Sequence, residues 1–251
     1  MPRTEKSHDS TMKCKAVVFD LFGTLVEPIS WEQEDALYAQ IAEVLALPQE
    51  GFTRLWRETR SMRLASGLDT IRKNIAFVGK RLNKPLKSSQ IEEAVAMRLA
   101  FTRSALTPRE DAEKTLGDLV SQGCRMALLS NCSPEVPELW TETTFSMLID
   151  TPIFSCVAGI EKPDLRIFQM ASSKLMLSPE DCVYVADGEN GEMAAAAKLG
   201  FQTVLIRSYD DAGQPVRKNP GAWKGPEIDI LGELMHILRV EPDADFFDSV
   251  S

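Results

Sequence analysis

The first residue that could do chemistry is Asp20, which follows an apolar run at 16–19 and stands in the sequence FDLFGTL, residues 19–25. Such a run predicts a buried parallel strand, so the Asp20 carboxylate is expected at the carboxyl edge of the sheet, where open α/β sheets bind ligands. A carboxylate there can attack phosphorus or carbon and be regenerated by water, so Asp20 is a candidate nucleophile. Gly23 allows a sharp turn, and Thr24 offers a hydroxyl to a bound anion. Because Asp-x-x-Gly-Thr is also common in plain turns, the assignment depends on the other strand ends.

Polar groups follow two further predicted strands. Ser130 and Asn131 come after the apolar run 126–129, and the Ser130 hydroxyl is available to a ligand. Lys162 follows a predicted strand at 154–158, and the proline after it restricts it to an extended conformation. A lysine in such a loop is usually only solvated, but at a sheet edge it is also a candidate for neutralising an anionic intermediate.

Two acids follow a fourth predicted strand, at 182–186. Asp187 comes directly after it, and Glu192 lies at the start of the next predicted helix. Acids are favoured at helix starts for purely structural reasons. They also supply oxygen ligands close to Asp20 if the strands are neighbours, which makes this edge a candidate magnesium site.

Taken in order, these four strand ends resemble the motifs of the haloacid dehalogenase (HAD) superfamily of hydrolases, from about residue 16 to 206. The resemblance implies an α/β fold with a Rossmann-like parallel sheet core and an inserted α-helical cap. It implies that Asp20 is the nucleophile, that Ser130 binds the transferred group and that Lys162 balances the charge. The implied Mg²⁺ ligands are Asp20, Asp187, Glu192 and the backbone carbonyl of Phe22. The candidate substrate-binding residues are Thr24, Ser130, Asn131 and Arg57.

One departure from the family pattern concerns Phe22. Phosphatases of the family have a second Asp at this position as general acid and base, and a phenyl ring transfers no proton. Haloacid dehalogenases also lack that Asp, because a halide leaves without a proton. The sequence LSNCSP at 129–134 resembles theirs, and Arg57 in the sequence LWR lies where they have a halide-binding arginine. Arg57 is also explained as a surface charge on an amphipathic helix.

The fourth strand end favours the opposite conclusion. Dehalogenases need no metal and have a Ser-rich sequence with an Asn there, whereas this chain has Asp187 and Glu192. Phe168 also stands where dehalogenases have a tyrosine. A metal can stabilise a departing oxygen and partly replace a missing acid. We therefore expect Mg²⁺-dependent hydrolysis of a small phosphate ester or diphosphate. The alternatives are a metal-independent 2-haloacid dehalogenase and a HAD-like binding protein without turnover.

The elements that must position these residues divide the chain into a core and an insertion. Between the first strand and residue 105 the spacing predicts helices without a strand, so we assign 28–105 to the cap and 13–27 with 106–240 to the core. Residues 1–12 and 241–251 are predicted to be flexible tails.

Three finer expectations concern helix and strand ends. The sequence Thr107-Pro108-Arg109-Glu110 predicts a capping box at the start of a helix that ends near Gly123. The third strand is expected at 154–158. A closing helix is expected over 231–240.

The composition limits the class of protein. Among 251 residues, 28 Lys and Arg stand against 37 Asp and Glu, and this acidic balance argues against non-specific nucleic-acid binding. No apolar run is long enough for a membrane span. Five scattered cysteines are expected to be buried free thiols, which suits the cytoplasm, and two histidines leave little for histidine-based catalysis. We expect a monomer or homodimer that acts on a small anionic molecule.

Overall fold

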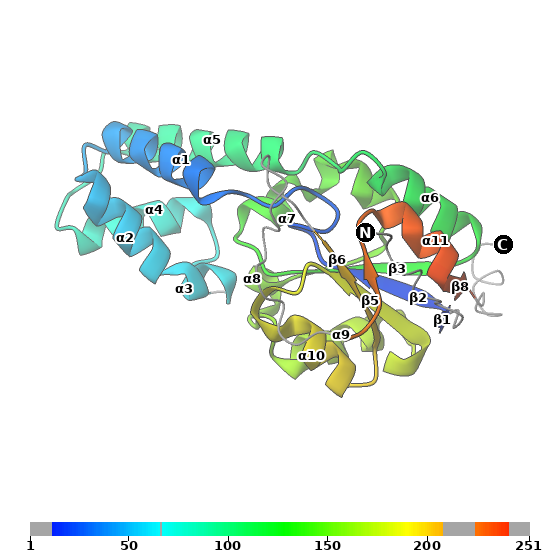
Figure 1. The fold of residues 1–251 in the computed structure, drawn as a ribbon. Coiled ribbons are helices and arrows are strands. Elements are labelled where there is room, and N and C mark those ends of the chain that lie inside the picture. Colours follow the sequence, from blue (N-terminus) through cyan, green and yellow to red (C-terminus); the bar gives the residue numbers. More distant parts are fainter. Residues whose placement is uncertain (1–11, 66, 208–223, 241–251) are drawn as a thin grey trace, which may run out of the picture.

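The computed structural model describes residues 12–65, 67–207 and 224–240, and within them the core is one six-stranded parallel sheet (Figure 1). The strands lie in the order β4-β3-β2-β5-β6-β7. Their bounds are β2 Ala16–Phe19, β3 Arg125–Ser130, β4 Thr151–Phe154, β5 Cys182–Ala186, β6 Gln202–Ile206 and β7 Glu227–Ile228. This is the α/β fold with a Rossmann-like parallel core that the sequence predicts.

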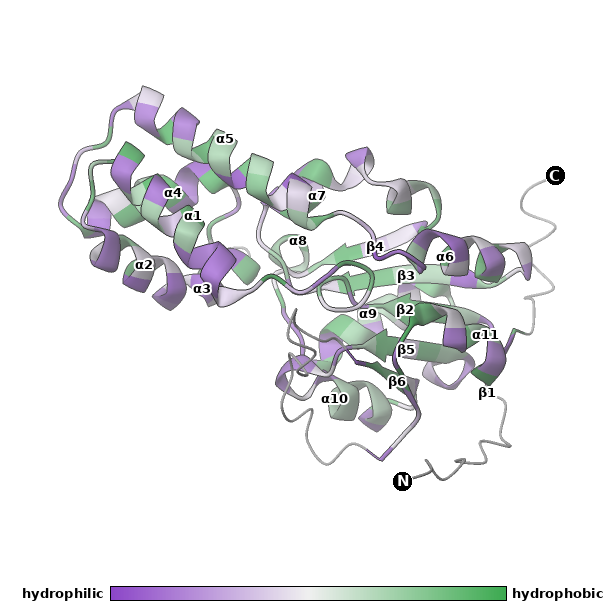
Figure 2. Cartoon of the chain, turned by 45° about the horizontal axis from the view of Figure 1, so that its top comes forward, coloured by the Kyte–Doolittle hydropathy of each residue, from purple (hydrophilic) through white to green (hydrophobic). Residues whose placement is uncertain are grey.

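Helices cover both faces of the sheet, because its central strands are apolar on both sides (Figure 2). On one face pack α6 (Ala112–Ser121) and α11 (Leu234–Ile237), in one apolar cluster with residues of β2, β3 and β5. On the other face pack α9 (Leu165–Leu175) and α10 (Glu192–Lys198), in a second cluster. The sheet is therefore buried between two helical layers.

The first strand, β2, lies at the centre of the sheet between β3 and β5. The strand order runs in opposite directions on its two sides, and this is the kind of switch point where open α/β sheets bind ligands. The carboxyl ends of three adjacent strands thus bring together Asp20, Ser130 and Asp187. The four-residue register that joins β2 to β5 fixes this relationship.

The first five helices after β2 form a separate body beside the core (Figure 1). They are α1 Trp31–Val44, α2 Gln49–Glu58, α3 Arg60–Leu64, α4 Ile71–Arg81 and α5 Ser88–Ala105. They enclose an apolar cluster of their own, in which the rings of Phe52 and Trp56 stack with centroids 5.4 Å apart. These helices lie within the predicted cap, whose boundaries stay a prediction.

Short elements complete the described chain. The helices α7 Glu135–Leu139 and α8 Ser155–Ala158 follow β3 and β4. The strand β1, Met12–Cys14, pairs in parallel with β8, Leu238–Val240. The predicted tails lie outside the described residues, except Met12. Among the described residues, no helix combines the length and apolar character that crossing a membrane requires.

The finer expectations about helix and strand ends are wrong in three places. The third strand, β4, ends at Phe154, and α8 occupies the next four residues. No capping box forms at Thr107, whose hydroxyl donates to the carbonyl of Ser104, because the backbone of Arg109 bonds to Leu25 before α6 begins at Ala112. The predicted closing helix is a short helix followed by β8. By contrast, Gly123 has the expected positive φ of 78°, and all five cysteines are free and buried.

Candidate active site

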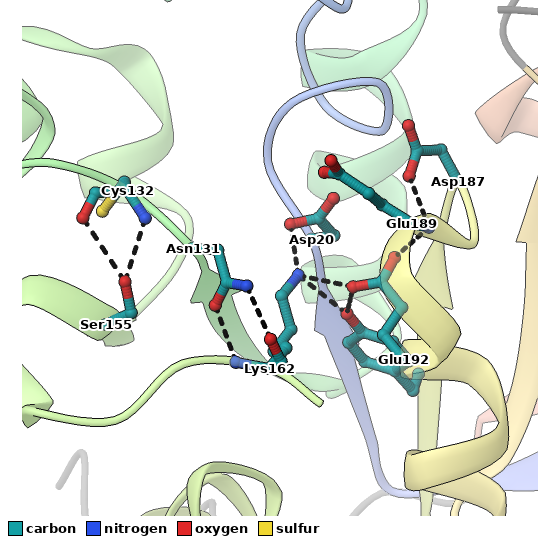
Figure 3. A network of polar contacts seen from close by, with 9 residues as sticks. Asp20, Asn131, Cys132, Ser155, Lys162, Asp187, Glu189 and Glu192 are labelled. Atoms are coloured by element: carbon teal, nitrogen blue, oxygen red, sulfur yellow. Dashed lines mark hydrogen bonds and ion pairs between the residues drawn. The ribbon is translucent and has the colours of Figure 1, made fainter. Parts of the chain in front are cut away.

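The ammonium group of Lys162 lies at the centre of the candidate site and contacts three of its side chains (Figure 3). Its Nζ lies 2.6 Å from Asp20 Oδ1 and 2.7 Å from Glu192 Oε2. It also donates to the Tyr184 hydroxyl at 3.0 Å, and that hydroxyl donates to Glu192 Oε2 at 2.8 Å. Burial by itself lowers the pKa of Lys162, but the charges of Asp20 and Glu192 outweigh this effect and raise it. Lys162 is therefore a permanent cation against the candidate nucleophile.

The side chain of Asn131 holds the Lys162 backbone in place. Its Nδ2 donates to the Lys162 carbonyl at 2.9 Å, and its Oδ1 accepts from the Lys162 amide at 2.8 Å. These two bonds connect the carboxyl end of β3 to the loop before α9. Asp164 then caps α9 by accepting from the Arg166 amide. The amide of Asn131 thus positions the lysine, whereas its predicted contact with substrate stays a prediction.

Three buried carboxylates meet beside this lysine. Asp20, Asp187 and Glu192 each offer an oxygen, and these oxygens lie within 4.8 Å of one another. The backbone amide of Glu189 donates to Asp187 Oδ1 at 3.2 Å and to Glu192 Oε1 at 3.1 Å, which orients both acids. The carboxylate of Glu189 itself points toward Asp20 (Figure 3).

Two carboxylates of this cluster, those of Asp20 and Glu192, share the ammonium group of Lys162. Burial is the largest effect on the pKa of Asp20 and raises it to about 8, against the lowering by Lys162. Glu192 and Asp187 raise that pKa further. Carboxylate oxygens that lie this close together are the kind of ligand set that Mg²⁺ binds. Asp20, Asp187 and Glu192 therefore fit the predicted metal, while a contribution from the Phe22 carbonyl stays a prediction.

Gly23 allows the loop after β2 to approach the acids closely. It has φ of +81°, and a Cβ there would lie 2.3 Å from Asp187 Oδ2. The loop is closed by bonds from the amides of Thr24, Leu25 and Val26 to the Leu21 carbonyl. A glycine at this position thus lets Asp187 stand beside Asp20.

Two hydroxyls of the predicted substrate site are fully buried. Within the described residues, neither Thr24 Oγ1 nor Ser130 Oγ has a hydrogen-bond partner. A buried hydroxyl without a hydrogen-bond partner destabilises the folded protein, unless a ligand or a water molecule supplies that partner. Neither residue lines the cavity described below, so the predicted contact of these hydroxyls with a ligand stays a prediction.

A cavity of about 1110 Å³ opens between this site and the cap helices. Asp20, Phe22, Asn131, Lys162 and Glu192 line it from the core. Arg57, Arg60, Arg63 and Arg98 line it from the cap. Arg57 reaches the cavity but pairs with Asp35 at 2.6 Å and stays 42% exposed, so both interpretations of this residue remain open.

Sequence reasoning missed several residues of the site. In the sequence, Tyr184 reads as one more residue of the apolar run 182–186. In the sheet its side chain points to the opposite face from those of Val183 and Val185, and its hydroxyl meets Lys162. Arg63 and Arg98 lie in helices whose other charges are solvated, and no pattern separates them. Only their burial in the folded structure does.

Comparison with known proteins agrees with this geometry. The sequence model described as haloacid dehalogenase-like hydrolase matches residues 14–200. The chain belongs to this family. As a HAD-like hydrolase it is 27% identical over 233 residues to (S)-2-haloacid dehalogenase 4A of Burkholderia cepacia, across 89% of this chain and 94% of that protein. It is also 27% identical over 228 residues to glyceraldehyde 3-phosphate phosphatase of Methanothermobacter thermautotrophicus, across 89% and 99%.

Solved structures show the same HAD-like fold. The HAD family enzyme bt-2542 of Bacteroides thetaiotaomicron, solved in complex with magnesium and inorganic phosphate, matches with a TM-score of 0.61 at 17% identity. The match covers 79% of this chain and 96% of that one. Relatives of this HAD-like hydrolase therefore include both a phosphatase and a dehalogenase, and the residues of the site must decide between the two chemistries.

Proposed function

We propose that this hydrolase cleaves small phosphate esters or diphosphates in a Mg²⁺-dependent reaction with Asp20 as the covalent nucleophile. The observation that carries this proposal is the buried carboxylate cluster of Asp20, Asp187 and Glu192, whose oxygens lie within 4.8 Å of one another. A dehalogenase attacking carbon needs no such cluster. The phosphatase relative and the magnesium and phosphate complex of the bt-2542 enzyme support the same chemistry.

In this mechanism each residue has a defined task. Asp20 attacks phosphorus, the bond to the leaving oxygen breaks, and an aspartyl-phosphate forms; water then attacks that phosphorus and regenerates Asp20. Lys162 balances charge on Asp20 and on the phosphoryl group. The hydroxyls of Thr24 and Ser130 donate to phosphoryl oxygens. When bound, Mg²⁺ would be held by the three carboxylates and would neutralise developing negative charge.

Phe22 limits the leaving group. It lines the cavity where a proton donor would otherwise stand. Leaving groups that need little protonation, such as those of diphosphates and acyl phosphates, are therefore expected to react faster than simple alkyl esters. The buried free cysteines support a reducing compartment such as the cytoplasm as the place of this activity.

A second candidate function is metal-independent dehalogenation of 2-haloacids. Phe22 favours it, and so does the similarity to the Burkholderia cepacia enzyme. In that reaction Asp20 would form an ester with carbon and expel a halide. The third possibility, a binding protein without turnover, predicts that Asp20→Asn leaves binding and cellular function intact.

The test measures phosphate release from para-nitrophenyl phosphate, acetyl phosphate and pyrophosphate. Wild type and Asp20→Asn are compared with Mg²⁺ and after chelation. Turnover that requires both Mg²⁺ and Asp20 supports the proposal. Halide release from 2-chloropropionate in the presence of chelator, with no phosphate release from any ester, would replace it by the dehalogenase.

A further inference from the structure

Two arginines of the cap are buried at the wall of the catalytic cavity. Arg63, in α3, is 5% exposed, and Arg98, in α5, is 7% exposed. Both line the cavity that also contains Asp20 and Lys162. Charged side chains are rarely buried to this extent unless anions pair with them.

The protein supplies only part of the required negative charge. Arg98 is paired with Glu135 of α7, from Nε at 2.8 Å and from Nη2 at 2.6 Å. Its third nitrogen, Nη1, is buried and has no hydrogen-bond partner among the described residues. A guanidinium donor that is buried and unpaired is costly unless a ligand accepts its hydrogen bond.

Arg63 forms no ion pair with a carboxylate among the described residues. Its Nη1 donates to the Trp56 carbonyl at 2.5 Å and to Thr59 Oγ1 at 2.9 Å, and both acceptors are neutral. The Trp56 carbonyl belongs to the last turn of α2, where a cation is favoured by the helix dipole. This contact satisfies the hydrogen bonding of one Arg63 nitrogen, but it does not neutralise the charge of the guanidinium group.

The indole of Trp56 brings the two cations together. The Arg63 Cζ lies 4.3 Å from the centroid of that ring and the Arg98 Cζ lies 5.5 Å from it. Burial, followed by repulsion from Arg98, lowers the pKa of Arg63 to about 10, so Arg63 stays charged at neutral pH. Two acids lie near these cations: the buried Glu135, paired with Arg98, and the half-buried Glu34, which also lines the cavity. Even so, Arg63 and the Nη1 of Arg98 have no direct carboxylate partner among the described residues.

We propose that Arg63 and Arg98 bind a second anionic group of the substrate, so that the substrate is a small phosphate compound with a further carboxylate or phosphate group. The proposal rests on the proposed function for the reacting phosphate at Asp20. Guanidinium groups bind the oxygens of carboxylates and phosphates in bidentate pairs, and these two arginines supply donors from two helices. Carboxylate and phosphate share this oxyanion chemistry, and the experiment separates them.

The test compares matched pairs of probes. Carboxyalkyl phosphates of increasing length are measured against alkyl phosphates of equal length, and alkanediol bisphosphates form the second arm. In the wild type, kcat/KM is expected to be about 10- to 100-fold higher for the doubly anionic member of a pair, the value of one or two charged hydrogen bonds. The arm with the larger ratio identifies the second group.

The variants are chosen so that folding does not decide the result. Arg63→Met keeps the apolar stem and breaks no ion pair. Arg98→Met is combined with Glu135→Gln, because Arg98→Met alone would leave a buried carboxylate unpaired. In both variants, the ratio of kcat/KM between the doubly anionic and the singly anionic member of a pair is expected to fall close to one. The control is Arg54→Met on α2, whose side chain is 71% exposed and which does not line the cavity; it should keep the wild-type preference.

A binding measurement separates this inference from the proposed function. In the Asp20→Asn background, butyrate and inorganic phosphate are titrated while the fluorescence of Trp56 is followed, with Trp56→Phe as the blank. Saturation that Arg63→Met abolishes supports the anion site even if no probe releases phosphate, which would reject only the proposed function. Hydrolysis of all probes with equal kcat/KM, or titration curves that are the same in Arg63→Met, would reject the anion site alone.

Discussion

The ammonium nitrogen of Lys162 lies 2.6 Å from an oxygen of Asp20, although 142 positions separate the two residues in the chain. The contact exists because β2 is central in the sheet and because Asn131 fixes the Lys162 backbone from the next strand. The same ammonium group contacts Glu192. Lys162 therefore serves two carboxylates at once, and removing it should affect both folding and catalysis.

Lys162→Met should lower the free energy of unfolding by about 3–5 kcal/mol at pH 7.5 without Mg²⁺, because the buried carboxylate of Glu192 loses its cation. Turnover should be lost as well. Urea denaturation of the metal-free protein measures the effect. Lys174→Met, at an exposed position of α9, is the matched control and should change stability by less than about 0.5 kcal/mol. An unchanged urea midpoint in Lys162→Met would contradict the ion-pair geometry.

Gly23→Ala should weaken metal binding. The new methyl group would lie 2.3 Å from Asp187 Oδ2. The backbone at residue 23 would also keep its positive φ, which costs an alanine at least about 1 kcal/mol. Asp187 must move away, so the Kd for Mg²⁺, measured by calorimetry, should rise. Gly117→Ala in α6 meets nothing within 4 Å and should leave the Kd unchanged while stabilising the helix by about 0.5–1 kcal/mol. Equal Mg²⁺ affinity in the Gly23→Ala variant would argue that Asp187 is not a ligand.

The pH dependence of stability should carry the signature of Asp20. Its pKa is about 8 in the folded protein and 3.8 ordinarily, so the folded state holds a proton that the unfolded state has lost between these values. The stabilisation from this group is complete below about pH 4 and is lost as the pH rises to about 8. Without Mg²⁺, the stability of Asp20→Asn minus that of wild type should therefore rise by about 1.4 kcal/mol per pH unit over this range.

Adding Mg²⁺ provides the control for this pH series. The cation stabilises the ionised carboxylate, so the advantage of Asp20→Asn at pH 8 should shrink or reverse. Thermal unfolding at pH 5, 6.5 and 8 measures both effects. A difference between the two proteins that stays constant with pH would show that Asp20 is ionised throughout.

Much of the fold and half of the site follow from local sequence. The strands that lead to Asp20, Ser130 and Asp187 contain apolar runs of four or five residues, and in a parallel sheet the carboxyl ends of such runs meet at one edge. This rule places Asp20, Ser130 and Asp187 together without knowledge of the structure. It also places Glu192 nearby, because that residue opens α10, the first α-helix after β5.

The errors have a different origin. At 155–158 the residues Ser-Cys-Val-Ala suit a strand, but the chain turns there into α8, where Ser155 bonds to the backbone of Cys132 on the neighbouring strand end. At Thr107, pairing with the loop after β2 overrides a local capping signal. Contacts between distant segments decide both places, and they leave no trace in a local pattern.

The buried arginines escape sequence reasoning for the same reason. The ion pair between Arg98 and Glu135 joins residues 37 positions apart, and the cap helices alone do not reveal which face meets the core. Arg57, by contrast, stands in a recognisable LWR sequence, but it pairs with Asp35. Tertiary burial, rather than residue type, separates these cations.

The most direct test of the central claim looks for the covalent intermediate on Asp20. The Mg²⁺-loaded protein is mixed with acetyl phosphate, quenched in acid, digested and analysed by mass spectrometry. The account predicts a single phosphoryl group on the peptide that contains Asp20, absent after chelation and absent in Asp20→Asn. Turnover with no phosphoryl group on Asp20, or a phosphoryl group that forms equally well without Mg²⁺, would contradict it.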